Sequence, residues 1–189
     1  MEMKTIINNA SYEIEIKNSR FITELIKINN NDIKDIINEL RIKYPKATHY
    51  TYAYRLGNYQ KSSDDGEPGG TAGIPMLSIL EKEDIINVLA VTIRYFGGIK
   101  LGAGGLVRAY TKSLTEALSH AELKELIKGY KVEIEIAYDK QKDLDYILRN
   151  QEIINKDYDL NIKYLVNIKE EDINIINNYN YKIIDNIYY

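Results

Sequence analysis

The sequence of 189 residues contains no cysteine and no tryptophan, and it has only two histidines and three prolines. The lack of cysteine excludes disulfides, thiol catalysis and thiolate metal sites, and it suits a reducing compartment. Because His49 and His120 lie far apart in the sequence, no histidine-rich metal site is expected. No apolar run approaches the roughly 20 residues of a membrane span, and the amino terminus lacks an apolar signal core. We therefore expect a cytoplasmic protein with no metal, no cofactor and no membrane partner.

The net charge is also small, only −3, because 25 basic side chains nearly balance 28 acidic ones. This excludes a grossly basic nucleic-acid-binding protein, although a local basic patch remains compatible with the total. Such a patch lies between Ile85 and Thr115, where Arg94, Lys100, Arg108 and Lys112 occur without any acidic residue.

Glycine, by contrast, is concentrated: ten of the eleven glycines fall between Gly57 and Gly105. Most lie in two loops, which we name the acidic glycine loop (residues 62–73) and the basic glycine loop (residues 94–108). Glycine is costly to order, so this density indicates positive φ angles or close approach of other groups. The opposite charges of the two loops make them the first place to look for function.

The basic glycine loop separates an apolar, β-branched stretch, residues 86–95, from a helix expected to begin at about Leu106. A buried strand, a glycine loop and a helix start together form a layout that can bind anions through backbone N–H groups. The candidate residues for binding an anion or nucleic acid are Arg20, Arg94, Gly97, Gly98, Lys100, Gly102, Gly104, Gly105 and Arg108. Close packing of the helix on the sheet explains the glycines equally well, but it does not explain the lack of acids.

The acidic glycine loop has a signature run of eight residues: Asp64, Asp65, Gly66, Glu67, Pro68, Gly69, Gly70 and Thr71. Its three acids offer oxygen ligands to a divalent cation, but their spacing does not match an EF-hand. We favour a turn in which Asp64 satisfies local N–H groups, and a salt link to Arg94 or Lys100 is a further alternative. His49 is either a general base or, as we expect, a structural histidine, because no acid or serine is evidently coupled to it.

Alternation and helical spacing predict the remaining elements of the first part. Strands are expected at residues 12–16, 21–28 and 48–56, and a helix capped by Asn31 is expected to stop near Tyr44 because Pro45 follows. A short helix is expected at residues 74–80. Tyr50, Tyr52 and Tyr54 share one face of a strand, where they either form core or stack on bases.

The last 60 residues contain neither glycine nor proline, so we place a domain boundary at Gly129, interpreted as the residue that ends a helix. The predicted domains are residues 1–129 and 130–189. In the second, strands at 131–138, 152–158, 161–168 and 181–188 and helices at 141–149 and 170–178 give the order βαββαβ, which is typical of ferredoxin-like domains.

Both glycine loops resemble the signatures of the IMPACT/YigZ family, also called uncharacterised protein family 29. The resemblance lies in DDGEPGGTAGIPML at 64–77 and RYFGGIKLGAGGLVRAY at 94–110, with further matches at 19–21 and 49–54. It implies an α+β fold with an amino-terminal domain like domain 2 of ribosomal protein S5 and a ferredoxin-like carboxyl-terminal domain. The eukaryotic relatives are translational regulators that contact an activator of a stress kinase. Thr51 stands where family members often have cysteine, so a thiol is not expected to be essential.

Three functions compete. The first is a non-enzymatic regulator associated with RNA, the ribosome or translation, which binds through the basic glycine loop. The second is an enzyme that binds a phosphorylated small molecule or nucleotide, and the third is a protein-binding adaptor. Because the sequence has a basic segment and no catalytic set, we favour the first and expect a protein that is not an enzyme.

Overall fold

The computed structural model describes residues 3–29 and 32–189. The chain forms two compact units, Met1–Glu125 and Leu126–Tyr189, so it divides ahead of the boundary predicted at Gly129. Both units mix helices with antiparallel strands, as the α+β prediction required. Within the described residues, no helix has both the length and the apolar character needed to cross a membrane.

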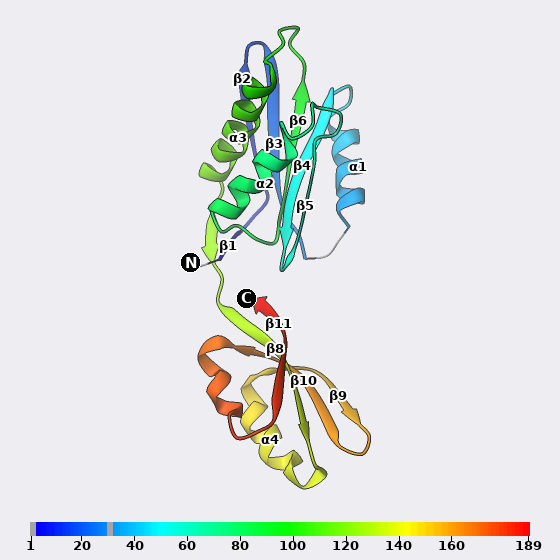
Figure 1. Ribbon diagram of the computed structural model, residues 1–189, viewed down its shortest axis with the longest axis vertical. Coiled ribbons are helices and arrows are strands. Elements are labelled where there is room, and N and C mark those ends of the chain that lie inside the picture. Colours follow the sequence, from blue (N-terminus) through cyan, green and yellow to red (C-terminus); the bar gives the residue numbers. More distant parts are fainter. Residues whose placement is uncertain (1–2, 30–31) are drawn as a thin grey trace. The chain divides into compact units, whose positions relative to one another are not determined.

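The first unit is built on a five-stranded sheet in the order β2-β3-β6-β4-β5 (Figure 1). Its strands are β2 (Ala10–Ile16), β3 (Ser19–Lys27), β4 (His49–Leu56), β5 (Tyr59–Ser63) and β6 (Val88–Tyr95). All neighbouring strands in this sheet are antiparallel. β6 lies at the centre and is buried along nearly its whole length, which confirms the prediction for residues 86–95.

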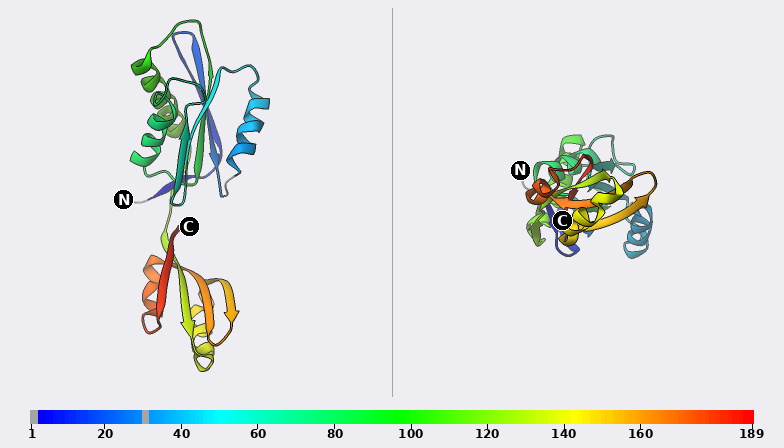
Figure 2. Two further views of the ribbon diagram at one scale, coloured as in Figure 1. Left: turned by 45° about the vertical axis from the view of Figure 1, so that its right-hand side comes forward. Right: turned by 90° about the horizontal axis from the view of Figure 1, so that it is seen from below.

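Helices cover both faces of this sheet. α1 (Ile33–Lys43) lies on one face, and α2 (Gly73–Lys82) and α3 (Ala103–Ser119) lie together on the other (Figure 2). The alternation of β4 sends Tyr50 to the α1 side and Ala53 to the α2–α3 side, as predicted. α3 begins three residues before the predicted Leu106, so that Gly104 and Gly105 lie in its first turn.

Some elements of the first unit differ from their predictions. α1 ends at Lys43, before Pro45 as expected, whereas the predicted cap Asn31 lies outside the described residues. β5 was not predicted, because its polar sequence YQKSS carries no apolar alternation. Two short strands, β1 (Lys4–Ile6) and β7 (Leu123–Glu125), pair with each other outside the main sheet.

The second unit has a four-stranded antiparallel sheet in the order β11-β8-β10-β9. Its elements are β8 (Lys128–Ile136), α4 (Gln141–Ile147), β9 (Glu152–Tyr158), β10 (Ile162–Lys169) and β11 (Tyr181–Tyr188), and short 3-10 segments lie at 138–140, 148–150 and 170–176. The predicted strand–helix–strand–strand–helix–strand order is present, but the second helix is 3-10.

The role predicted for Gly129 is wrong. Gly129 does not end a helix, because α3 already stops at Ser119 and Gly129 lies inside β8. A Cβ atom there would lie 2.7 Å from the carbonyl oxygen of Ile168 on the paired strand β10. This glycine is therefore required by close strand contact and not by a helix terminus.

Candidate functional site

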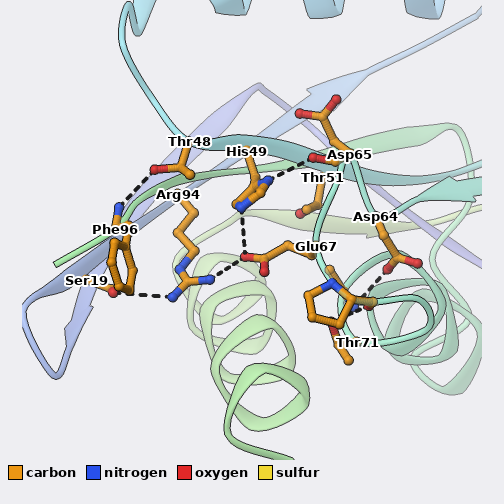
Figure 3. Close-up of polar contacts among 12 residues, drawn as sticks. Ser19, Thr48, His49, Thr51, Asp64, Asp65, Glu67, Thr71, Arg94 and Phe96 are labelled. Atoms are coloured by element: carbon orange, nitrogen blue, oxygen red, sulfur yellow. Dashed lines mark hydrogen bonds and ion pairs between the residues drawn. The ribbon is translucent and has the colours of Figure 1, made fainter. Parts of the chain in front are cut away.

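The two glycine loops meet through a buried ion pair. Arg94, at the end of β6, donates from Nη1 to Oε1 of Glu67 in the acidic glycine loop at 2.5 Å. Figure 3 shows the contact between the two side chains. They are only 5% and 3% exposed. The salt link from the acidic glycine loop to Arg94, one of the alternatives offered by the sequence, is therefore present. It fixes one loop against the other.

Two further side chains complete this arrangement, which we name the Glu67 cluster: Glu67, Arg94, Tyr110 and His49. The Tyr110 hydroxyl on α3 donates to Glu67 Oε1 at 2.6 Å. Burial, together with this hydrogen bond, raises the pKa of Tyr110 far above its ordinary value, so the phenol remains a neutral donor. The cluster thus joins the acidic glycine loop, β6 and α3.

His49 takes its place in the cluster from the sheet register, since it lies directly opposite Arg94 across β4 and β6. Its Nδ1 atom lies 2.8 Å from the carbonyl oxygen of Asp65, so Nδ1 carries the proton and donates it. Its Nε2 atom then faces Glu67 Oε1 at 3.8 Å. His49 therefore has structural contacts through one nitrogen and an acidic neighbour on the other.

The other two acids of the acidic glycine loop also have partners inside the unit. Asp64 accepts hydrogen bonds from the backbone N–H groups of Gly70, Ala72 and Gly73 at 2.8–2.9 Å, where α2 begins. Partial burial alone would raise the pKa of Asp64, but these three donors outweigh it and lower the pKa. The turn expected around Asp64 is thus confirmed.

Asp65 connects the loop to the opposite face of the sheet. Its Oδ1 accepts from Arg41 Nη2 at 2.8 Å, and its Oδ2 accepts from the backbone N–H of Tyr50 at 2.6 Å. Across the described ranges, no group of three or more histidine or acidic side chains is arranged to hold a metal ion. The acidic glycine loop is therefore a structural brace whose carboxylates are all engaged.

The remaining residues of the signature run shape the turn. Thr71 is buried and donates from its hydroxyl to the carbonyl oxygen of Pro68 at 2.6 Å. Gly66 and Gly70 have positive φ angles of 85° and 76°, whereas Gly69 is open to added side-chain volume. These contacts are local and support the turn.

Glycines of the basic loop serve packing and turning. A Cβ atom on Gly97 would lie 2.0 Å from the backbone carbon of Asn18, so only glycine fits there. Gly102 turns the chain into α3 with a φ of 70°. The three others are Gly98, with a φ of 84°, Gly104, next to the Arg108 side chain, and Gly105, next to Leu101.

The predicted basic set does not form one patch. Arg94 is buried in the Glu67 cluster, and Arg20 pairs with Glu13 at 2.8 and 2.9 Å while lying over the Tyr95 ring. Lys100 and Arg108 are exposed, and neither takes part in an ion pair found among the described residues. The structure therefore divides the basic candidates into two groups. Arg20 and Arg94 are paired with glutamates, whereas Lys100 and Arg108 are not, within the described part of the chain.

A cleft of about 440 Å³ lies between the two loops. Glu67, His49 and Arg94 line its polar side, and Lys100 and the first residues of α3 line another part. Phe96 and Leu106 contribute apolar walls. This volume falls in the range of small-molecule sites, roughly 300–1,000 Å³.

Sequence reasoning missed two contributors to this region. Tyr110 was not among the predicted site residues, although a tyrosine hydroxyl usually needs a hydrogen-bond partner when it is buried. Phe96, whose backbone N–H donates to Thr48 Oγ1 at 3.1 Å, gave no comparable signal.

Comparison with known proteins agrees with the resemblance in the two loops. Residues 17–118 match the Impact N-terminal domain. IMPACT family member YvyE of Bacillus subtilis is 36% identical over 176 residues, which cover 90% of this chain and 81% of YvyE. IMPACT family member YigZ of Escherichia coli is 36% identical over 152 residues, which cover 76% of this chain and 74% of YigZ.

Solved structures extend the likeness to the fold. A crystal structure described as that of a hypothetical protein superposes with a TM-score of 0.72 at 31% identity, covering 92% of this chain and 89% of the other. The two-domain translational regulator Yih1 gives a TM-score of only 0.35 at 23% identity, covering 62% of this chain and 48% of Yih1, too little for a structural argument. On the domain match and the extent of identity to YvyE and YigZ, this chain belongs to the IMPACT family.

Proposed function

We propose that the protein is a non-enzymatic regulator associated with translation, which binds RNA phosphates through a basic rim of Lys100, Arg108 and Lys112. Membership in the IMPACT family supports the translational part, because the family resemblance implies translational regulators among the eukaryotic relatives. The RNA-binding part rests on the charges around the start of α3.

One observation carries this proposal: no acid of the acidic glycine loop forms an ion pair with Lys100, Arg108 or Lys112 in the described parts of the chain. Asp64 binds backbone N–H groups, Asp65 pairs with Arg41, and Glu67 pairs with Arg94. The rim therefore keeps its positive charge, although Arg94 and Arg20 no longer contribute free charge to it. The proposed RNA contacts are therefore fewer than the basic residues that the sequence suggested.

The geometry of α3 also suits an extended anion. Arg108 and Lys112 are four residues apart on one helix, so their side chains lie on the same side of it. Lys100 precedes the helix start, where unpaired backbone N–H groups and the helix dipole add partial positive charge. Phosphates along an RNA strand match this arrangement of charges.

Co-sedimentation with purified bacterial ribosomes across a salt series tests the proposal. The variant Lys100→Ala/Arg108→Ala should reduce binding at low salt and lower the salt slope by about 0.7 for each single-strand phosphate that the protein no longer neutralises. The matched control Lys82→Ala/Lys124→Ala removes the same charge from exposed positions of the same unit and should bind as the parent does. If Lys100→Ala/Arg108→Ala kept the affinity and the salt slope of the parent protein, as the control should, the basic rim would be refuted as the binding surface.

The cleft between the loops favours a second candidate function, binding of a phosphorylated small molecule. Its volume of about 440 Å³, Lys100 in its lining and the adjacent α3 start are the supporting observations. Glucose 6-phosphate is a suitable probe, and the backbone NMR signals of Gly102 and Ala103 report its binding. Shifts of these signals that Lys100→Ala abolishes would support this function, whereas unchanged signals at millimolar ligand would remove it.

A further inference from the structure

A second hollow lies on the opposite face of the main sheet, between α1 and the β4–β5 hairpin. Its volume is about 390 Å³. The polar and aromatic side chains that line this hollow, which we name the α1 pocket, are Lys34, Asn38, Arg41, Tyr52, Tyr54 and Lys61. None of them belongs to the basic rim or the Glu67 cluster.

The pocket exists because this face of the sheet is only partly covered. α1 covers this face, whereas α2 and α3 cover the opposite face (Figure 2). The apolar side of α1 packs over residues of β3, β6 and β4, and β5 lies at the sheet edge. Tyr52 and Tyr54 on β4 are consequently half-buried, in contrast to the fully buried Tyr50.

The pocket is strongly cationic. Three basic side chains line it, and no carboxylate does so among the residues that the structure describes. Arg41 is held by Asp65, but Lys34 and Lys61 are exposed and take part in none of the ion pairs found in the described parts of the chain. The pocket therefore keeps two uncompensated positive charges.

The acids of α1 do not offset this charge. The helical residues that line the pocket recur at spacings of three and four, from Lys34 through Asn38 to Arg41, so they form one side of α1. Asp35 and Glu39 follow Lys34 and Asn38 by one residue each, which rotates them toward the solvent side.

Two tyrosine side chains add an aromatic surface to the cationic pocket. Tyr52 and Tyr54 are two residues apart on β4 and therefore lie on the same face of the sheet. Their hydroxyl groups take part in none of the side-chain hydrogen bonds found for the described residues, so they remain available at the pocket. Aromatic rings next to cationic side chains are the combination by which proteins bind a base and its phosphate.

From this combination, we infer that the α1 pocket binds a nucleotide, with the base against Tyr52 or Tyr54 and the phosphate near Lys34 and Lys61. A free nucleotide and one nucleotide of a single-stranded RNA present the same chemistry. The pocket volume lies within the range of small-molecule sites. The inference goes beyond the proposed function, because it concerns another face of the unit and other residues.

Calorimetric titration of the full-length protein tests the inference, with adenosine 5′-monophosphate and a short single-stranded oligoadenylate as separate probes. Adenosine lacks the phosphate and ribose 5-phosphate lacks the base, so each should bind at least tenfold more weakly than the mononucleotide. The variant Lys34→Gln/Lys61→Gln should weaken binding about tenfold, and Tyr54→Leu should do so because leucine cannot stack on the base. The matched control Lys82→Gln/Lys124→Gln should bind as the parent protein does.

The probes distinguish the sources of the nucleotide. Mononucleotide binding that the lysine variant weakens supports a free nucleotide, and binding of only the oligoadenylate with the same loss supports RNA. No binding of either probe, or binding that the lysine variant leaves unchanged, overturns the inference. Because Lys34 and Lys61 are exposed, the lysine variant should keep the parent's thermal unfolding even if Tyr54→Leu does not. Loss of oligoadenylate binding in Lys100→Ala/Arg108→Ala alone would assign that binding to the basic rim and overturn the pocket.

Discussion

Replacement of Arg94 by methionine should destabilise the first unit severely, because it leaves the carboxylate of Glu67 buried without its ionic partner. Glu67 is 3% exposed at its side chain, and its remaining partners there are the Tyr110 hydroxyl and the more distant His49 ring. Removal of one member of a buried ion pair typically costs about 3–5 kcal/mol. This is a large share of the roughly 5–15 kcal/mol that stabilises a typical protein.

Chemical denaturation followed by circular dichroism measures this loss, and the double variant Glu67→Gln/Arg94→Met sharpens the result. The double variant buries no unpaired charge, and glutamine retains a carbonyl oxygen for Tyr110. It should therefore be more stable than Arg94→Met alone. If Glu67→Gln alone is less stable than the parent protein, the four proteins form a double-mutant cycle that shows coupling between the two residues.

Arg20→Met is the matched control, because Arg20 also pairs with a glutamate but in an exposed position. Exposed ion pairs contribute little to stability, so this variant should unfold close to the parent protein. The reasoning would be refuted if Arg94→Met cost less than about 1 kcal/mol, or if the double variant were less stable than Arg94→Met. Either result would mean that Arg94 is not required as the partner of Glu67.

Three further predictions concern other parts of the chain. Asp64→Ala should cost about 1–2 kcal/mol at neutral pH, because the backbone N–H groups at the start of α2 lose their acceptor. Since the pKa of Asp64 is lowered in the folded state, this cost should shrink as the pH falls below the ordinary pKa of 3.8. Urea unfolding at several pH values measures both effects. Gly97→Ala should lower the thermal midpoint markedly, since its Cβ would lie 2.0 Å from backbone, whereas Gly69→Ala, with open space, should not. A fragment comprising residues 126–189 should retain cooperative unfolding by circular dichroism, because this unit has its own buried core, and a non-cooperative transition would contradict it.

Local patterns predicted much of the fold. The alternating tyrosines identified β4 and its two faces, the apolar stretch identified β6, and Pro45 limited α1. Local rules failed where an element has no apolar period, as in β5, or where a glycine serves contact between strands, as at Gly129. In both cases the neighbouring strand determines the conformation.

The candidate site was predicted in part. The role of Asp64 followed from short-range turn chemistry, because all its backbone partners lie within nine residues. Arg94, in contrast, was grouped with Lys100 and Arg108 as an anion contact, and its salt link to the acidic glycine loop was only an alternative to the favoured turn. Its actual partner Glu67 lies 27 residues away in sequence and on another loop, so no local pattern specified the pair.

The sequence by itself determined the two opposed glycine loops, the order of most elements and the family, because these depend on residue type and spacing along the chain. The tertiary structure decided which charges remain free. The sheet register sets His49 opposite Arg94, and the fold buries Arg94 against Glu67 while Lys100 and Arg108 stay exposed. Burial makes an unpaired charge costly, so arginines that look alike in sequence become an internal brace in one position and a free surface cation in another.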